Sequence, residues 1–271
     1  MARIIAICNQ KGGTGKTTTA INLSVAVAMA GKKVLLVDID PQANATSGAG
    51  IDKNKIEKSI YDVLTNGIEI KVVLLSSPEN NIAILPSDAH LAGAEVELVA
   101  LLSREYRLKR AIEPIASEFD FIFIDCPPSL GLLTINALAA ADSVMIPVQC
   151  EYYALEGLTQ LTKSIGLVRN NLNSSLKIEG LLMTMADYRT NLTQEVISEV
   201  RNHFKEKVYQ TVIPRNIRLT EAPSFGKSIF IYDKDSAGAK KYRELANEIL
   251  GIDDKQPIEN SIVTDNVQFT A

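Results

Sequence analysis

The amino-acid sequence predicts a single α/β domain, built on a mainly parallel, twisted sheet with helices on both faces. Short apolar runs rich in β-branched residues alternate with helix-like segments, and this alternation is typical of parallel sheets with helical crossovers. Most runs are apolar at consecutive positions, as expected for strands that are buried on both faces. No linker rich in proline, glycine or serine and no internal repeat interrupts the alternation, so we expect one domain over residues 1–250.

The expected elements follow each other in regular order. The first apolar run leads into a glycine-rich loop and a helix, and the second ends in acidic residues. The later runs are separated by helix-like segments in the same way. We expect strands at residues 3–8, 33–38, 81–85, 121–125, 143–148, 178–185 and 208–213, and helices at residues 17–30, 132–140, 155–170, 193–204 and 237–250. The remaining segment, 251–271, is polar, contains Pro257 and has no sustained period, so we expect a flexible tail.

The composition narrows the classes of function. With 271 residues, of which 46% are hydrophobic and 22% charged, the chain can bury a substantial core. The net charge of −4 argues against a protein that coats nucleic acid with a uniformly basic surface. Any binding of nucleic acid must therefore use a local patch.

The cysteines and the N-terminal segment indicate the compartment. Cys8, Cys126 and Cys150 are widely spaced and form no C-x-x-C pair, which suits a reducing environment and predicts small buried residues at strand ends. The N-terminal segment lacks the pattern of an export signal, and no apolar run reaches about 18 residues. We expect a cytoplasmic protein.

The unusual polar residues follow three of the expected strands. The loops NQKGGTGKTT at 9–18, DIDPQAN at 38–44 and DCPPSLG at 125–131 each begin where a strand ends. Ligands of open parallel sheets bind beyond the carboxyl ends of the strands. We therefore expect the three loops to converge on one crevice.

The first loop has the residues of a phosphate cradle, although the usual pattern G-x-x-x-x-G-K-[ST] would place a glycine where Gln10 stands. Glycines let successive N–H groups point inward, and the helix that follows presents its positive end to an anion. We expect Lys16 to lie against the β and γ phosphates, Thr17 to coordinate Mg²⁺ and Thr18 to lie near the α phosphate. The expected nucleotide-binding residues are Lys11, Gly12, Gly13, Thr14, Gly15, Lys16, Thr17 and Thr18.

The loop after the strand FIFID places Asp125 where an aspartate often holds a metal through its water shell. An aspartate at a strand end is often only a helix cap. Its combination with the phosphate-binding pattern favours the metal site.

Asp38 and Asp40 lie two residues apart at the end of another strand, and would point the same way if the strand ran through both. A carboxylate near the phosphates can orient the water that attacks a γ-phosphate. We assign this water-orienting role to Asp40 and a supporting place near the metal to Asp38, and we count Lys16, beside the phosphates, as a further catalytic residue. Either aspartate, taken singly, could instead form the turn before Pro41.

Three separated motifs resemble the ParA/Soj branch of the deviant Walker A ATPases, which partition chromosomes and plasmids. They are KGGTGKTTTAINLSVAVAMAGKKVLLVDIDPQANAT at 11–46, FDFIFIDCPPSLGLLTINALAAAD at 119–142 and VIPRNIRLTEAPSFGKSI at 212–229. In that family the loop reads KGGxGK[ST], so Lys11 matches the signature lysine and Gln10 is no defect. The resemblance implies an ATP-dependent sandwich dimer in which Lys11 reaches the phosphates of the partner subunit. A second positive charge there suits the charge that gathers in the transition state.

The resemblance also implies sites outside the three loops. Pro214 and Asn216 match family positions that contact the nucleotide base, although a surface turn would explain them as well. Arg189 and Arg218 match positions implicated in sequence-independent binding of double-stranded DNA, where arginines meet phosphates. Solvated surface arginines are an equally common explanation.

Relatives that share the loop differ elsewhere. A MinD-like membrane ATPase would end in a basic amphipathic helix, whereas this chain ends in acidic and polar residues, so no stable membrane binding is expected. The cysteines are not placed for an iron–sulfur cluster shared across a dimer. A synthase of the cobyrinic acid or dethiobiotin type is not expected to carry PRNIRLTEAPSFG. The loop begins at residue 9, so we expect no preceding helix-turn-helix domain and no specific operator binding.

These features predict a nucleoid-associated partition ATPase. ATP and Mg²⁺ are the expected cofactors, and the expected partners are a second copy of the chain, non-specific DNA and a ParB-like centromere-binding protein that stimulates hydrolysis. The alternative is an ATP-switched positioning protein of the MinD-like superfamily for another cargo, in which binding rather than turnover is the function.

Overall fold

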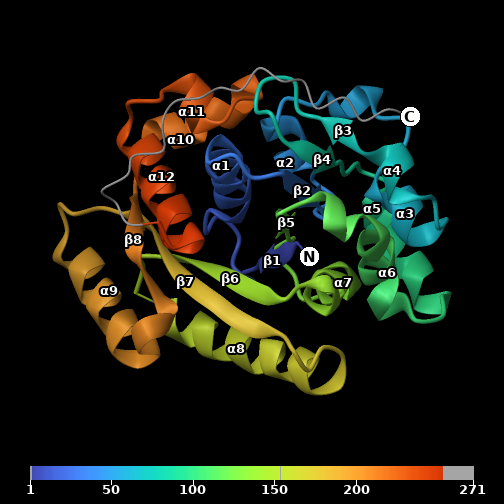
Figure 1. Cartoon of the computed structure of the whole chain (residues 1–271). Helices are drawn as coiled ribbons and strands as arrows, with labels where there is room; N and C mark the ends of the chain where they lie inside the picture. The colour runs from blue at the N-terminus through green and yellow to red at the C-terminus, as the bar shows by residue number, and fades with distance from the viewer. Residues whose placement is uncertain (1, 153, 253–271) are drawn as a thin grey trace.

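The computed structural model describes residues 2–152 and 154–252 and contains one eight-stranded sheet (Figure 1). The strand order is β3-β4-β2-β5-β1-β6-β7-β8. Neighbouring strands pair in parallel except β3 and β4, which are antiparallel. The strands are β1 (Arg3–Ile7), β2 (Val34–Asp38), β3 (Leu75–Ser76), β4 (Ala83–Leu85), β5 (Phe121–Asp125), β6 (Ser143–Gln149), β7 (Lys177–Ala186) and β8 (Val208–Pro214).

Helices cover both faces of the sheet (Figure 1). On one face α1, α2, α11 and α12 contribute to one apolar cluster, and on the other face α3, α5, α6, α7, α8 and α9 contribute to a second. The helices are α1 (Lys16–Met29), α2 (Asn44–Gly48), α3 (Ile60–Thr65), α4 (Ile70–Val73), α5 (Leu91–Glu97), α6 (Arg107–Ile112), α7 (Leu132–Ala140), α8 (Ala154–Asn171), α9 (Asn191–Phe204), α10 (Ile217–Glu221), α11 (Ile229–Tyr232) and α12 (Ala237–Leu250).

The predicted architecture is confirmed, and the seven expected strands and five expected helices are all present within a few residues of their expected bounds. The sequence did not predict the two-residue strand β3, the short helices between residues 44 and 112, or the short helices α10 and α11. Of the segment 251–271, for which a flexible tail is predicted, residues 253–271 lie outside the described residues.

The central strands are buried along their whole length, which explains their uninterrupted apolar sequences. Every residue of β2 and of β5 is buried, including the aspartate that ends each strand. In the registers of β1, β2 and β5, Asp125 is opposite both Ile7 and Asp38. The three strands therefore end at one level, and the loops that follow them meet there.

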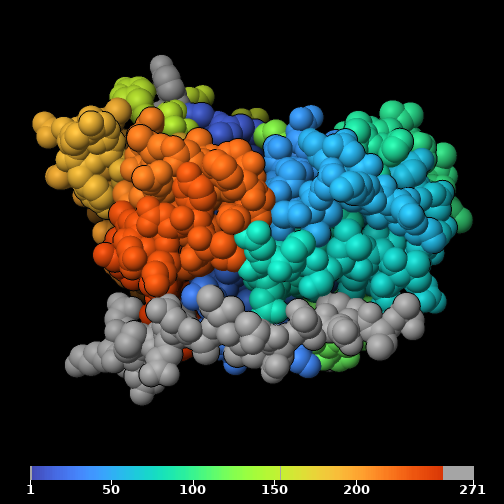
Figure 2. All heavy atoms as spheres, turned by 90° about the horizontal axis from the view of Figure 1, so that it is seen from above, coloured from blue at the N-terminus to red at the C-terminus, as the bar shows by residue number. Residues whose placement is uncertain are grey.

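The C-terminal third of the chain packs against the segment around α2. Figure 2 shows the orange residues of this third directly beside the blue residues near the start of the chain. At the contact, Gly50 and Gly226 both have positive φ values, 88° and 64°. A Cβ atom added at Gly226 would lie 2.8 Å from the Gly50 Cα atom, so the close approach requires glycine.

Candidate functional site

The loop between β1 and α1 has the backbone of an anion-binding turn. Gly13 and Gly15 have φ values of 74° and 87°, which residues with a Cβ atom rarely adopt. Gly15 is the N-cap of α1, no side chain caps this helix end, and its first turn has no acidic residue. The N–H groups at the start of α1 are therefore available to an anion.

Neighbouring strands hold the loop in place. The Asn9 side chain donates to the Pro147 carbonyl at 2.7 Å and accepts from the Lys11 N–H at 3.0 Å. The Thr184 hydroxyl, from β7, donates to the Thr14 carbonyl at 2.9 Å. Contacts with β6 and β7 thus hold the loop in this conformation.

Lys16 projects back under the loop rather than into solvent. Its side chain is buried, with 7% of the residue exposed, and its Nζ atom donates to the Lys11 carbonyl at 3.2 Å. Its positive charge lowers the pKa of the nearby Asp125 carboxyl, although other effects raise that pKa overall. A buried ammonium held at an anion-binding loop is a preformed partner for phosphate.

Asp125 is the least satisfied polar side chain of the site. The residue is fully buried, and neither carboxylate oxygen has a hydrogen-bond partner among the described residues. Burial raises the pKa of Asp125 well above its usual value, and the nearby charges of Asp38 and Asp40 raise it further. The Thr17 hydroxyl and Lys16 lie close enough to lower this pKa in part.

Asp38, by contrast, is tied to its surroundings. One carboxylate oxygen accepts from the Thr46 N–H at 2.8 Å and the Thr46 hydroxyl at 2.7 Å, and the other accepts from the Asp40 N–H at 3.1 Å. Burial nevertheless raises its pKa to about 6, because desolvation outweighs these bonds.

Asp40 lies beyond the strand, because β2 ends at Asp38. The condition under which both aspartates would point the same way is therefore not met. The Asp40 carboxylate instead accepts from the Gln42 N–H at 2.9 Å, which forms a tight turn around Pro41. Asp40 still lies near enough to Asp125 for its charge to raise the pKa of that residue.

The donor set fits a magnesium ion bound together with phosphates. Among the described residues, no group of three or more His, Cys, Asp or Glu side chains could hold a metal by itself. Mg²⁺ commonly keeps several waters and takes one or two carboxylates plus substrate phosphates, so a protein-only cage is not required. The unpartnered oxygens of Asp125 can supply such a ligand, and a Cβ atom added at Gly12 or Gly13 would meet no atom within 4 Å, which leaves open space at the loop.

Lys11 projects away from this buried cluster. Its ammonium forms an ion pair with Glu151, from the loop that follows β6, and both side chains are about half exposed. An exposed pair of this kind contributes only about 0–1 kcal/mol, so Lys11 can exchange its partner at little cost.

The two arginines assigned to DNA lie at one end of the sheet, away from the aspartates. Arg189 follows β7 and Arg218 is in α10, which follows β8, and these two strands are neighbours. Each arginine is exposed and paired with acidic residues. Arg189 pairs with Asp187, and Arg218 with Glu221 and Asp233.

Pro214 ends β8, and Asn216 is the N-cap of α10, where its side-chain oxygen accepts from the Arg218 N–H at 2.8 Å. This is the surface turn that the sequence left open as an alternative. The cap uses the carbonyl oxygen of Asn216, and so leaves the amide NH₂ group as the donor that an adenine ring could receive.

The cysteines are buried at the ends of their strands, as predicted. The Sγ atoms of Cys8 and Cys126 lie 2.8 Å apart, directly beyond the paired residues Ile7 and Asp125. Burial raises the pKa of the Cys126 thiol, so it stays in the protonated form.

The helices of residues 2–152 and 154–252 include no candidate for a membrane span, which requires both sufficient length and a continuous apolar sequence.

Three residues of the site were not found from the sequence. Thr46 holds Asp38, Glu151 holds Lys11, and Ser87 donates its hydroxyl to the Asp40 carbonyl at 2.7 Å. Ser87 and Glu151 are 47 and 140 residues away from their partners, so no local pattern connects them. Thr46 is the last residue of the motif at 11–46 and could have been found as a hydroxyl near Asp38 and Asp40.

Comparison with known proteins identifies close relatives. A family model described as an AAA domain matches residues 2–178. The sporulation initiation inhibitor protein Soj of Bacillus subtilis is 58% identical over 249 residues, which cover 92% of this chain and 98% of the relative. The chromosome partitioning protein ParA of Myxococcus xanthus is 54% identical, with coverage of 92% and 88%. The chromosome-partitioning ATPase Soj of Treponema pallidum is 49% identical, with coverage of 93% and 99%.

Solved structures have the same fold. A cobyrinic acid a,c-diamide synthase from Mycobacterium smegmatis, crystallised with an ATP analogue and magnesium, is 38% identical with a TM-score of 0.81 over 92% of this chain and 95% of that chain. The cell division ATPase MinD of Pyrococcus furiosus is 28% identical with a TM-score of 0.76, and the match covers 93% and 99%. The partition proteins are more similar to this chain in sequence than either structure is.

Proposed function

The chain belongs to the Soj/ParA family of chromosome-partitioning ATPases, and from this premise we propose that it forms an ATP-bound dimer that binds DNA without sequence preference. It is an ATPase that uses ATP and Mg²⁺. Hydrolysis, stimulated by a ParB-like partner, resets the dimer. In terms of populations, ATP favours the DNA-binding dimer and hydrolysis removes that preference.

One observation carries the proposal. Neither oxygen of the buried Asp125 carboxylate has a hydrogen bond of normal geometry among the described residues, and the carboxylate lies close to the Thr17 hydroxyl, the buried ammonium of Lys16 and the uncapped start of α1. An unpaired buried carboxylate costs stability, so its retention beside an anion-binding loop supports a bound cation and phosphate.

The residues of this cluster have distinct roles in the proposal. Lys16 and the N–H groups at the start of α1 bind the phosphates, and Thr17 and Asp125 hold Mg²⁺, with Asp38 as a support. Mg²⁺, when bound, neutralises charge on the phosphate oxygens. Thr14, Thr18 and the glycines complete the cradle, and Pro214 and Asn216 lie beside the base.

Asp40 orients the attacking water. Its carboxylate oxygens have one donor, the Gln42 N–H, among the described residues, so they keep acceptor capacity for a water. Its backbone is held on both sides, through Asp38 and through Ser87, which keeps the carboxylate in one place.

Lys11 acts in the partner subunit's site. In the single chain its ammonium is paired with Glu151 at the surface, and formation of the dimer transfers it to phosphate. This exchange replaces a weak exposed pair by a charge-assisted contact in a site that is closed to water.

DNA binds to the surface that carries Arg189 and Arg218, and the protein is associated with the nucleoid. Phosphates displace the acidic partners of the two arginines, so binding depends on salt.

Hydrolysis measurements test the proposal. ATP turnover should rise when both DNA and a ParB-like protein are added, and Lys16→Ala should lose tight ATP binding. Turnover that stays at background with both additions would favour the alternative, a positioning protein that uses ATP only as a switch.

A further inference from the structure

Four buried groups form a hydrogen-bond chain behind Asp40. The Thr46 hydroxyl donates to the Asp38 carboxylate at 2.7 Å and accepts from the Ser87 N–H at 2.9 Å. The Ser87 hydroxyl donates to the Asp40 carbonyl at 2.7 Å. Asp38, Thr46 and Ser87 are fully buried, and Asp40 is 7% exposed. The hydroxyl groups of Thr46 and Ser87 therefore connect Asp38 and Asp40 to the loop that contains Ser87.

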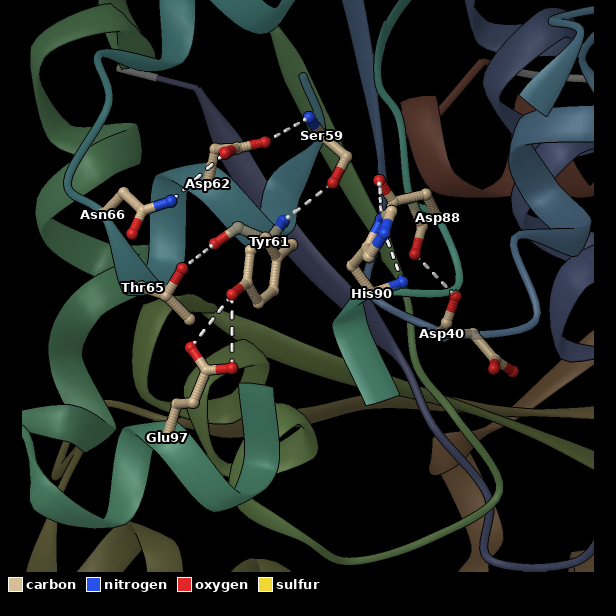
Figure 3. A network of polar contacts seen from close by, with 10 residues as sticks. Asp40, Ser59, Tyr61, Asp62, Thr65, Asn66, Asp88, His90 and Glu97 are labelled. Atoms are coloured by element: carbon tan, nitrogen blue, oxygen red, sulfur yellow. Dashed lines mark hydrogen bonds and ion pairs between the residues drawn. The ribbon is translucent and has the colours of Figure 1, made fainter. Parts of the chain in front are cut away.

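The loop that contains Ser87 is held by contacts outside the nucleotide-binding loop at 9–18. Pro86, the residue before Ser87, accepts a hydrogen bond of 2.9 Å from the Ile60 N–H at the start of α3. Ser59 caps this helix with a complete capping box, in which Asp62 takes part. Figure 3 shows this end of α3 and the loop through Asp88 and His90 beside Asp40. Through its neighbour Pro86, Ser87 is thus held by the capped N-terminus of α3.

The chain of bonds fixes the backbone of Asp40 more firmly than its side chain. The Asp40 carbonyl accepts from the Ala43 N–H at 2.9 Å as well as from Ser87, so both of its lone pairs are used. Ala43 has a φ value of 54°, an uncommon backbone conformation for a residue other than glycine. A strained turn of this kind persists only where surrounding contacts hold it, and Ser87 supplies such a contact through the Asp40 carbonyl.

We propose that Ser87 and Thr46 are positioning residues for ATP hydrolysis: Ser87 holds the backbone from which the Asp40 carboxylate projects, and Thr46 holds the Asp38 carboxylate. The inference rests on the proposed role of Asp40. Hydrolysis depends steeply on the placement of the group that orients the water, whereas nucleotide binding depends on the separate loop at 9–18. Loss of either hydroxyl should therefore lower turnover and spare ATP affinity.

Ser87→Ala in the full chain tests this, with Ser77→Ala as the matched control. The Ser77 hydroxyl is also buried and donates to a backbone carbonyl, that of Ala49, at 2.5 Å, but it does not contact Asp40. Both variants should lower Tm to a similar extent. Only Ser87→Ala should lower kcat, by about tenfold, with the Kd for ATP unchanged. Equal kcat values for the two variants would overturn the proposal.

Thr46 offers a rescue by a conservative change. Thr46→Val removes the hydroxyl and keeps the shape, and should lower kcat with unchanged Kd for ATP, whereas Thr46→Ser keeps the hydroxyl and should retain most of the turnover. A loss that is as large in Thr46→Ser as in Thr46→Val would show that packing, not the hydrogen bond, is responsible.

Asp40→Ala separates this inference from the function on which it rests. If Asp40→Ala turns over ATP normally, the role of Asp40 is wrong and the positioning role ends with it. If Asp40→Ala loses turnover but Ser87→Ala does not, only the positioning inference is wrong. The inference is supported when both lose turnover and both still bind ATP and dimerise with it.

Discussion

At the scale of single residues, the buried carboxylate of Asp125 links stability to ligand binding. Its pKa is raised in the folded chain, so the stability that it contributes is present at low pH and is lost as the pH rises through the folded pKa. At neutral pH this carboxyl is ionised in the unfolded chain, whereas in the folded chain it must either take up a proton or carry a buried charge, and either one lowers the stability of the folded protein. In the proposed function, bound Mg²⁺ offsets this cost.

Asp125→Asn should raise the Tm of the nucleotide-free protein at pH 7 and flatten its dependence on pH. An increase of about 3 °C corresponds to about 1 kcal/mol for a domain of this size. The same change should remove most of the additional stability that Mg²⁺ with ATP gives to the wild type. Thermal unfolding with and without Mg²⁺ and ATP measures both effects, and a variant that is destabilised without nucleotide would contradict this account.

Single residues differ in how well the sequence could predict their place. Lys16, Thr17 and Asp125 stand in patterns whose spacing alone brings them to one edge of the sheet, and the structure places them together. Ser87 and Glu151 could not be predicted, because their contacts depend on how distant loops fold back.

At the scale of elements, the contact between Gly50 and Gly226 joins the segment that carries Asp40 to the segment that carries Arg218. Both glycines have positive φ, and the two backbones touch, so side chains are excluded from the contact. Pro223 also packs beside α2, where a Cβ atom added at Gly48 would lie 3.4 Å from its side chain. The segment that follows Asp40 and the segment that follows Arg218 are therefore in direct backbone contact.

Gly226→Ala should destabilise the protein far more than Gly31→Ala does. Gly31 has a φ of 80° but open space around its Cα atom. Alanine there should lower the free energy of unfolding only through backbone strain, by about 1 kcal/mol. Gly226→Ala adds a clash with the Gly50 backbone, for which we expect about 2 kcal/mol more. Urea unfolding compares the two variants, and similar midpoints would mean that the contact yields easily.

The long elements were predictable because their apolar residues form continuous patterns, as in the fully buried β2 and β5. The short helices between residues 44 and 112 were not, because they depend on distant partners, whereas the strand expected at 81–85 in the same segment is present as β4. The start of α3, for example, is bound to Pro86, and β3 is only two exposed residues long. Local pattern carries little information where tertiary contacts decide the structure.

At the scale of the whole molecule, the overall charge gives no sign of the proposed DNA-binding surface. The net charge is −4, and both assigned arginines are paired with acidic residues of their own chain. In the proposed function, attraction to DNA arises when two chains place these arginines on one surface. The fold and the nucleotide loops could be predicted from the sequence, whereas the proposed DNA surface also depends on the proposed dimer.

Arg189→Glu combined with Arg218→Glu should abolish retention on non-specific DNA while ATP-dependent dimers still form. Arg189→Lys with Arg218→Lys keeps the charges and should retain salt-sensitive binding, since phosphate contacts require charge more than a planar group. Filter retention at several salt concentrations measures this. If the charge-reversed protein is retained like the wild type, the DNA surface lies elsewhere.

The central claim is that ATP closes a dimer in which each Lys11 serves the other subunit, and the molar mass of Asp40→Ala tests it most directly. This variant should bind ATP without consuming it, so light scattering with ATP and Mg²⁺ should show twice the mass found with ADP. The double variant Asp40→Ala, Lys11→Ala should have the mass of one chain in the same buffer. Its affinity for ATP should be largely unchanged. A single-chain mass for Asp40→Ala with saturating ATP, or an undiminished dimer without Lys11, would contradict the account.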